Sequence, residues 1–443
     1  MSLKVDATSL MLQITESLQR LLSSLTSPPT TLIVGFSGGV DSSFLLHALA
    51  CSSLGSSTSL PPLHAVYIHH GLSDQADQWQ LHCQEFCEQR NIRFSAVKVQ
   101  VPDLPRTSLE ATARDARYDA LLDICKREQG ALVLGQHQDD QVETLLLALK
   151  RGSGPAGLAA MPAVSTKCDV ALLRPMLNVS RSSLEAAAKA FSLEWVEDES
   201  NTDLRFDRNY LRQTILPMIT ARWEQFGGSV SKSAELLQEQ NALLDEVTKE
   251  RFLSSRNADN TLSAARIQAL SLPWQRAVIR YWIRLHRKPM PSRIQLEEIL
   301  QTMGARVDAN PVVSMSGYDI RRYNQSLFLT ESLSRPEQQK VTPGTIIRLP
   351  WWPLAFEIDG QGDFSVVPAN EIKRLQVLNN PLAKTPGKWF KEWKVPPWLR
   401  TQVPVIIDNE HPVAVVLTDK IIYLSAAQKA QYDIRLVETA LPE

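Results

Sequence analysis

Short apolar runs alternate with longer amphipathic stretches through the first half of the chain. The runs have the length and composition of strands buried on both faces of a sheet, and the stretches between them have helical composition. We predict a strand that begins at Thr31, further strands over 63–69, 92–99 and 131–135, and helices over 43–50, 74–90, 108–128 and 139–150. This β-α-β-α order predicts an α/β domain with a doubly wound parallel sheet, covered by helices on both faces.

The second half of the chain has two other patterns. Between about 222 and 335 the pattern is mainly helical, with a long helix over 229–252, a helix after Pro273 and a hairpin over 318–330. Strand-like runs then follow at 345–349, 354–358, 403–407 and 412–417. Because 443 residues exceed what one core usually supports, we expect two or three domains, and the patterns divide the chain into three. They are the α/β domain over 1–221, a mostly helical domain over 222–335 and a small α+β domain over 336–443.

A glycine-containing loop joins the first predicted strand to the first predicted helix. It consists of Ser37, Gly38, Gly39, Val40, Asp41 and Ser42. The free N–H groups of a first helical turn attract anions, and glycine lets a phosphate approach the backbone without meeting a Cβ. No Gly-Lys-Ser/Thr follows, so this is not a Walker loop. The simpler alternative is a turn that only packs the helix on the sheet.

The SGGxDS pattern of this loop resembles the PP-loop of the ATP pyrophosphatases. The resemblance implies that the chain binds ATP and splits it into AMP and pyrophosphate while adenylating a substrate oxygen. It also implies that Asp41 helps to place the magnesium ion that accompanies the phosphates.

Polar clusters follow two other predicted strands, at 69–72 and 136–140. The carboxyl ends of parallel strands share one edge of a sheet, so we expect these clusters to lie near the loop. Asp139 and Glu143, four residues apart, share one face of the following helix. Two acids beside an ATP loop could hold magnesium or a cationic substrate, but the helix dipole and plain solvation explain them equally well.

Arginines in the first domain form two groups, each with two interpretations. Arg114 shares a helical stripe with Glu110 and Arg117 and suits phosphate recognition, although by itself a surface pair with Glu110 is the more frequent meaning. The second group follows a polar, turn-forming segment over 198–203 and comprises Arg205, Arg208 and Arg212. These side chains could meet phosphates or face solvent.

A basic stripe lies opposite the apolar face of the predicted helix after Pro273. It comprises Arg276, Arg280, Arg284 and Arg287. Without an interleaved acid the stripe suits an RNA backbone, although a solvated helix face is the more frequent meaning. Lysines also interleave with aromatic residues between 384 and 398, a pattern that can grip phosphates and stack on bases. An amphipathic core helix explains that segment about as well.

The overall composition narrows the class of protein. With 44% hydrophobic and 21% charged residues, it is typical of a soluble globular protein. We find no signal-peptide pattern and no apolar run of membrane-spanning length, and therefore expect no membrane association. The five cysteines include no C-x-x-C pair, which suits reduced thiols in the cytoplasm. With a net charge of −1, affinity for nucleic acid must come from local patches.

Five further motifs follow the loop: HHGLS (69–73), EATARDARYDAL (110–121), QHQDDQVETLLLALKRGSGPAGLAAM (136–161), LLRPMLNVSRSSLE (172–185) and EDESNTDLRFDRNYLR (197–212). Near the end stands KWFKEWKVPPWLRTQVPV (388–405). The motifs and their order resemble the tRNA(Ile)-lysidine synthases, in the longer form with a C-terminal domain. Many members have histidine where Gln136 stands, which makes His137 the more interesting residue of this pair.

This resemblance implies a PP-loop domain of the adenine nucleotide alpha hydrolase kind and a defined reaction. ATP, with Mg²⁺, would adenylate the C2 oxygen of the wobble cytidine in a tRNA(Ile) with a CAU anticodon. The ε-amino group of L-lysine would then displace AMP to give lysidine, and the codon specificity would change from AUG to AUA.

We take as candidate catalytic residues Asp139, Glu143, Arg114 and His137, with Asp41 as the candidate metal ligand. The candidate tRNA contacts are Arg205, Arg208, Arg212, Arg276 and Arg280. Two other functions stay open. One is a PP-loop tRNA cytidine thiolase, which normally needs cysteines for sulfur delivery, and the other is a non-catalytic, nucleotide-gated RNA-binding scaffold. A homodimer is also left open.

Overall fold

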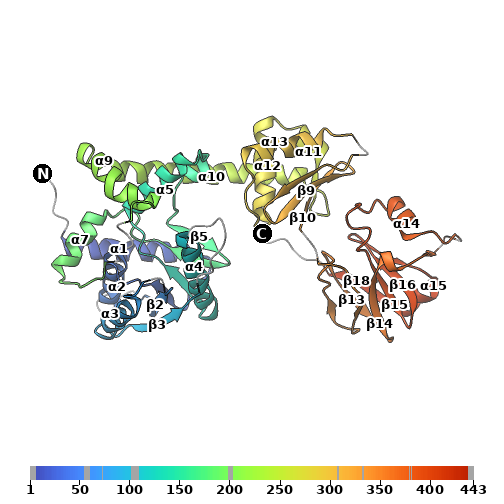
Figure 1. The fold of residues 1–443 in the computed structure, drawn as a ribbon, viewed down its shortest axis with the longest axis horizontal. Coiled ribbons are helices and arrows are strands. Elements are labelled where there is room, and N and C mark those ends of the chain that lie inside the picture. The colour runs from blue at the N-terminus through green and yellow to red at the C-terminus, as the bar shows by residue number, and fades with distance from the viewer. Residues whose placement is uncertain are drawn as a thin grey trace. The chain divides into compact units, whose positions relative to one another are not determined.

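A six-stranded sheet organises the first part of the chain (Figure 1). Its strands are β1 (Leu32–Gly35), β2 (Leu63–His69), β3 (Arg93–Lys98), β4 (Ala131–Val133), β5 (Val164–Lys167) and β6 (Val170–Leu173). The strand order is β3-β2-β1-β4-β6-β5, and every pair is parallel except the edge pair β5–β6. The predicted parallel sheet is therefore confirmed, with an antiparallel strand added at one edge.

The computed structural model describes residues 6–53, 60–71, 73–100, 109–197, 203–306, 309–331, 334–378, 380 and 382–437. The chain divides into two compact units, Met1–Ala242 and Leu243–Glu443. The predicted polar turn lies outside the described residues except for Asp203, as does the side chain of Glu110. Among the helices described, none is long and apolar enough to cross a membrane.

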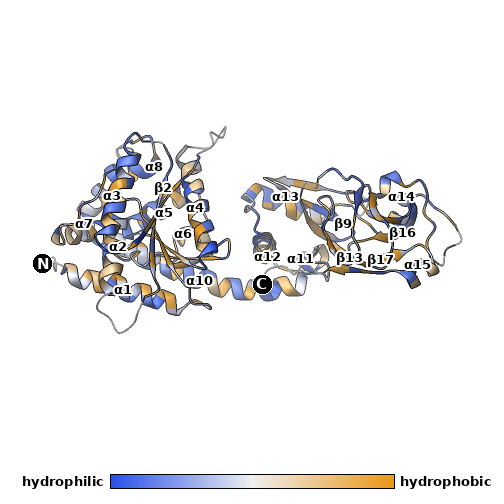
Figure 2. Ribbon diagram, turned by 90° about the horizontal axis from the view of Figure 1, so that it is seen from below, coloured by the Kyte–Doolittle hydropathy of each residue, from blue (hydrophilic) through white to orange (hydrophobic). Residues whose placement is uncertain are grey.

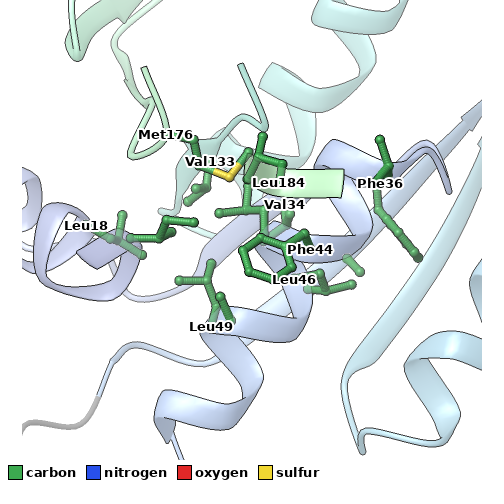
Figure 3. Packing of buried hydrophobic residues seen from close by; sticks show 14 of the residues in the cluster. Leu18, Val34, Phe36, Phe44, Leu46, Leu49, Val133, Met176 and Leu184 are labelled. Carbon is green, nitrogen blue, oxygen red and sulfur yellow. The ribbon is translucent and has the colours of Figure 1, made fainter. Parts of the chain in front are cut away.

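Helices cover both faces of the sheet because alternate residues of each strand point to opposite sides. Leu32 and Val34 of β1 belong to one core, which also includes side chains of α1 (Ala7–Ser23), α2 (Val40–Ser53), α3 (Ala76–Glu88) and α7 (Arg181–Ala190). Figure 3 shows part of this core around Val34 and Phe44. Ile33, between them, belongs to a second core with α4 (Leu109–Arg127). The two faces therefore have separate cores.

The remaining helices of the first unit lie beyond the carboxyl end of β4 in the sequence. They are α5 (Gln138–Lys150), α6 (Pro155–Leu158), α8 (Asp207–Tyr210), the π-helix η2 (Leu211–Ile215), α9 (Leu216–Arg222) and the start of α10 (Phe226–Ser255). Val142, Leu216 and Val230 pack together and join α5, α9 and α10. The predicted long helix is confirmed within α10, along which hydrophobic and hydrophilic residues alternate (Figure 2).

The second unit begins with a helical region that packs on a small antiparallel sheet. Its helices after α10 are α11 (Ala264–Gln268), α12 (Leu272–Leu285) and α13 (Arg293–Met303). The sheet consists of β7 (Leu262–Ser263), β8 (Val312–Met315), β9 (Tyr318–Tyr323) and β10 (Ser326–Thr330). The predicted hairpin is β9–β10, and Val278 and Trp282 of α12 are buried as expected.

The C-terminal part is rich in strands, as predicted. One sheet contains β11 (Gln339–Lys340), β14 (Phe364–Pro368), β15 (Pro404–Asp408), β16 (His411–Val416) and β17 (Ile421–Tyr423). The other contains β12 (Ile346–Ile347), β13 (Ala355–Asp359) and β18 (Asp433–Val437). Its helices are η3 (Ala369–Glu371), α14 (Pro386–Glu392) and α15 (Ala426–Gln431). Trp389 and Phe390 of α14 are buried, which favours the core-helix interpretation of this lysine-rich segment.

The core around α2 predicts a large difference between two identical substitutions. Leu46→Ala removes a fully buried side chain (0% exposed) and should lower the free energy of unfolding by about 2–5 kcal/mol. Leu12→Ala on α1 alters a side chain that is 55% exposed. This substitution should change the free energy of unfolding by less than about 0.5 kcal/mol. Urea unfolding followed by circular dichroism would measure both, and equal effects would contradict this description of the core.

Candidate active site

The glycine-containing loop lies between β1 and α2 and is closed by its own serines. The Ser42 hydroxyl donates a hydrogen bond to the Gly39 carbonyl (3.1 Å) and accepts one from the Ser37 N–H (3.3 Å). The hydroxyls of Ser37 and Ser42 also lie 3.2 Å apart. Because Ser42 is occupied in shaping the loop, the backbone N–H groups at the start of α2 are the main candidates for binding phosphate.

The two glycines of the loop have different reasons to be glycine. Gly38 has a φ of +79°, and a Cβ there would come within 2.9 Å of the Val196 Cγ2 atom. Gly38 also accepts a backbone hydrogen bond from Val196 (2.9 Å). Gly39 has an ordinary φ, and the nearest atom to a Cβ there is the Ser37 Oγ at 3.6 Å. The fold therefore requires Gly38, whereas Gly39 keeps open the space in front of the loop.

A cavity of about 520 Å³ lies beside the loop and the carboxyl ends of β1, β2 and β4. Arginines from several elements line it, namely Arg114, Arg117, Arg181, Arg208 and Arg212. The acidic residues among its lining are Asp41, Asp140 and Glu197. The five guanidinium groups outnumber the three carboxylates, and guanidinium groups match phosphate oxygens in geometry and charge. The cavity therefore suits a polyphosphate ligand.

His137 links α5 to the loop. It is the N-cap of α5, where its Nδ1 accepts the backbone N–H of Asp139 (3.2 Å). Its Nε2 lies 3.5 Å from Asp41 Oδ2 and 3.6 Å from Asp140 Oδ2. Burial opposes protonation, but these carboxylates raise the pKa of His137 to about 9. The cap requires Nδ1 to accept, so this conformation places one proton on Nε2, toward the carboxylates, and opposes the second proton that the carboxylates favour.

Asp41 is held as a carboxylate by these neighbours. Burial opposes its ionisation, but the contact with His137 and the charges of Arg181 and Arg212 lower its pKa overall. Its Oδ1 is buried and has no hydrogen-bond partner among the described residues. An unpartnered carboxylate oxygen beside a phosphate loop is a suitable magnesium ligand. No cluster of three or more metal-binding side chains occurs in the described ranges.

Arg212 connects the acids of α5. It contacts both carboxylate oxygens of Glu143 (2.8 and 3.2 Å) and Asp140 Oδ1 (3.2 Å). Glu143 is fully buried, and burial raises its pKa while the charge of Arg212 opposes that change. Asp140 and Arg212 line the cavity, whereas Glu143 lies behind Arg212. Glu143 is therefore paired with Arg212 and is not part of the cavity lining.

Asp139 contacts the start of α7 and does not line the cavity. Its Oδ1 accepts the backbone N–H of Arg181 (3.2 Å). The acid that faces the cavity is its neighbour Asp140. The spacing of four residues led to the pairing of Asp139 with Glu143. Asp140 and Glu143 are three residues apart, and this spacing also places two side chains on one side of a helix.

The other predicted site residues are divided between cavity and surface. Arg114, Arg208 and Arg212 line the cavity, whereas Arg205 is exposed and pairs with Asp203. On α12, Arg276 contacts Glu297 (2.5 and 2.9 Å). Arg280 is exposed and makes no hydrogen bond or ion pair with the residues that the structure describes. Three residues that line the cavity were not among the predicted site residues: Asp140, Arg181 and Glu197. No local sequence pattern marks Arg181 or Glu197.

Comparisons with known proteins agree across the chain. Family models match at residues 10–219 (PP-loop domain), 262–328 (TilS substrate binding domain) and 365–432 (TilS substrate C-terminal domain). The tRNA(Ile)-lysidine synthase of Proteus mirabilis (strain HI4320) is 38% identical over 405 residues, which are 88% of this chain and 91% of that protein. That of Vibrio vulnificus (strain CMCP6) is 39% identical over 402 residues, 87% of this chain and 91% of that protein.

A solved structure, the U34-tRNA thiolase NcsA from Methanococcus maripaludis, is similar over 52% of this chain and 77% of its own chain. Its TM-score is 0.44 and its sequence identity 16%.

The two loop glycines predict separable defects. Gly38→Ala forces a Cβ into a left-handed conformation and against Val196, and should lower the free energy of unfolding by about 1–3 kcal/mol. Gly39→Ala meets no close atom, so stability should hold while ATP affinity falls about tenfold, because the methyl group occupies the approach to the loop. Thermal unfolding and calorimetric titration with a non-hydrolysable ATP analogue would measure the two effects. Unchanged ATP affinity in Gly39→Ala would contradict the proposed approach of phosphate.

Proposed function

Because this chain belongs to the family of tRNA(Ile)-lysidine synthases, we propose that it ligates L-lysine to C2 of the wobble cytidine of tRNA(Ile) with a CAU anticodon, using ATP. The cytidine C2 oxygen attacks the α-phosphate of ATP, and pyrophosphate leaves. The ε-amino group of lysine, after losing a proton, then attacks C2, and AMP leaves with the oxygen. The product, lysidine, reads AUA in place of AUG.

One observation carries this assignment at the level of the site. A single cavity brings together the phosphate loop, five arginines and the acids Asp41 and Asp140. The loop and the arginines suit the triphosphate, and the acids suit the positively charged partners that accompany it. An adenylating ligase requires these two environments to lie next to each other, since both substrates must meet at the α-phosphate.

We assign the contact with the cationic amine of lysine to Asp140. It faces the cavity, whereas Asp139 faces α7 and Glu143 is occupied by Arg212. Arg114, Arg208 and Arg212 would stabilise negative charge on the transferred adenylate. His137 acts by holding Asp41 from behind the loop.

Magnesium fits this site through Asp41, whose Oδ1 is buried without a hydrogen-bond partner in the described ranges. When bound there, the ion would neutralise charge on the phosphates of ATP.

The tRNA itself is proposed to bind outside the ATP cavity as well. Residues 262–328 and 365–432 match substrate domains of the family, which supports a division into 1–221, 222–335 and 336–443. Arg280 is exposed and available to phosphates, whereas Arg205 would have to be shared with Asp203 and Arg276 with Glu297. We also propose a cytoplasmic location, where the tRNA substrate is found. Homodimerisation stays a prediction that light scattering would test.

A thiolase is the less well supported alternative. Cys83, Cys87 and Cys125 are buried, and burial raises the pKa of each thiol. Reactive sulfur carriers require an accessible thiolate, which these environments disfavour. Cys83 and Cys87 belong to the hydrophobic core on one face of the sheet.

The decisive experiment is incubation of the protein with ATP, Mg²⁺, labelled lysine and a panel of tRNAs, followed by nucleoside analysis. We expect lysidine only in tRNA with the CAU anticodon, and only when all four components are present. Thiolated cytidine would favour the thiolase, and absence of any modified base would favour the scaffold.

Neighbouring acids of α5 provide a matched test of the lysine contact. Asp140→Asn removes the charge that faces the cavity and should lower lysidine formation on the order of a hundredfold or more. Asp139→Asn can still accept the hydrogen bond from Arg181 and should cause a much smaller loss. Pyrophosphate release, assayed without lysine, would show whether Asp140→Asn spares adenylation. Equal losses in both variants would refute this assignment of Asp140.

A further inference from the structure

A buried arginine lies directly behind the cavity. Arg174 follows β6 and is 7% exposed. Its Nη1 donates hydrogen bonds to the Pro162 carbonyl and the Ser165 hydroxyl (2.9 Å each), and its Nε donates one to Gln136 Oε1 (2.5 Å). These acceptors are neutral, Arg174 also has a side-chain hydrogen bond with Tyr118, and no carboxylate in the described part of the chain pairs with it. The guanidinium is therefore fixed by directional hydrogen bonds rather than by a counter-ion.

This contact fixes the orientation of the Gln136 side chain. A guanidinium group has only donors, so the carboxamide atom that faces Arg174 must be the oxygen. The amide nitrogen then lies on the other branch, away from Arg174. Gln136 lines the cavity, and its Nε2 donates to no described residue. Gln136 therefore presents N–H donors to the cavity, and reversing the carboxamide would place its N–H groups against the Arg174 Nε–H.

The neighbours of Gln136 place it beside the end of the phosphate loop. Gly135 packs so closely on the start of α2 that a Cβ there would lie 3.3 Å from Asp41 C and Ser42 N. On the other side, His137 Nε2 lies 3.5 Å from Asp41 Oδ2. Phosphate groups of ATP bound at this helix start would lie beside Gln136. A base whose oxygen attacks the α-phosphate would therefore approach the same side of the cavity.

We propose that Gln136, oriented by Arg174, donates a hydrogen bond to N3 of the target cytosine and thereby selects cytosine over uracil. This inference rests on the proposed function. Cytosine O2 is engaged with phosphorus during adenylation, which leaves N3 as the adjacent acceptor on the same edge. In uracil, N3 carries a proton and would oppose the amide donor. Arg174 acts here as a positioning residue, and Gln136 as the residue that contacts the substrate.

The test replaces the hydrogen-bond donors that Gln136 presents to the cavity by acceptors. Gln136→Glu keeps an acceptor for Arg174, so the fold is preserved, but it presents only acceptors to the cavity. Gln136→His keeps the original polarity, because one ring nitrogen can accept from Arg174 while the other donates. Gln129→Glu makes the same amide-to-carboxylate change at an exposed position before β4, far from the loop in the sheet, and serves as the control.

Each variant is assayed for pyrophosphate release with tRNA(Ile) transcripts that carry cytidine or uridine at the wobble position. For Gln136→Glu we expect kcat/KM with the cytidine transcript to fall about ten- to a hundredfold and the preference for cytidine over uridine to shrink. The KM for ATP should stay within about twofold. Gln136→His should keep the preference, and Gln129→Glu should match the wild type in all assays.

Two results would overturn the inference. An unchanged cytidine preference in Gln136→Glu would mean that Gln136 does not contact the edge of the base, and a defect confined to KM for ATP would place its donor on the nucleotide instead. Wild-type protein that makes no lysidine would refute the proposed function itself. That result needs no variant, so it is distinct from a failure of the inference about Gln136. Thermal unfolding of the variants would separate loss of fold from loss of recognition.

Discussion

The structure of the site depends on one constraint: the first turn of α2 must leave its N–H groups free at the edge of the sheet. Ser42 closes the loop from within, and the close packing of Gly135 holds the helix start against β4. His137 supports Asp41 from the next strand end. A helix terminus with unpaired donors is stable only where a ligand or solvent can reach it. The cavity in front of the loop is the space that this requirement keeps open.

The charged residues that line the cavity are held in place by buried residues that do not line it. The residues that line it carry an excess of arginine, and buried groups behind them hold their orientation. Glu143 fixes Arg212, and Arg174 fixes Gln136. A fully buried carboxylate such as Glu143 is tolerable only with a close cationic partner, since an unpaired charge would be strongly destabilising. Such preorganised groups need little rearrangement when charge develops on the substrate, which favours catalysis.

Much of the fold could be predicted because its signals are local. β2 occupies the predicted range, and the hydrophobic stripe of α12 points inward as its spacing indicated. The β5–β6 hairpin escaped prediction because its turn carries no glycine. Cys168 and Asp169 adopt φ values of 50° and 66° in a two-residue turn of the kind that usually contains Asn-Gly or Asp-Gly. Composition alone did not reveal that conformation.

The sequence by itself determined the phosphate loop, the parallel sheet and the family to which the chain belongs. Each depends on residues adjacent in the chain or on the period of a strand or helix. Only the tertiary structure decided that Asp140 rather than Asp139 faces the cavity, that Arg208 and Arg212 join it, and that the Gln136 carboxamide oxygen accepts a hydrogen bond from Arg174. The direction of a side chain is set by the partner it meets. For Gln136 that partner is Arg174, brought close by the pairing of β4 with β6, so spacing along the chain could not show it.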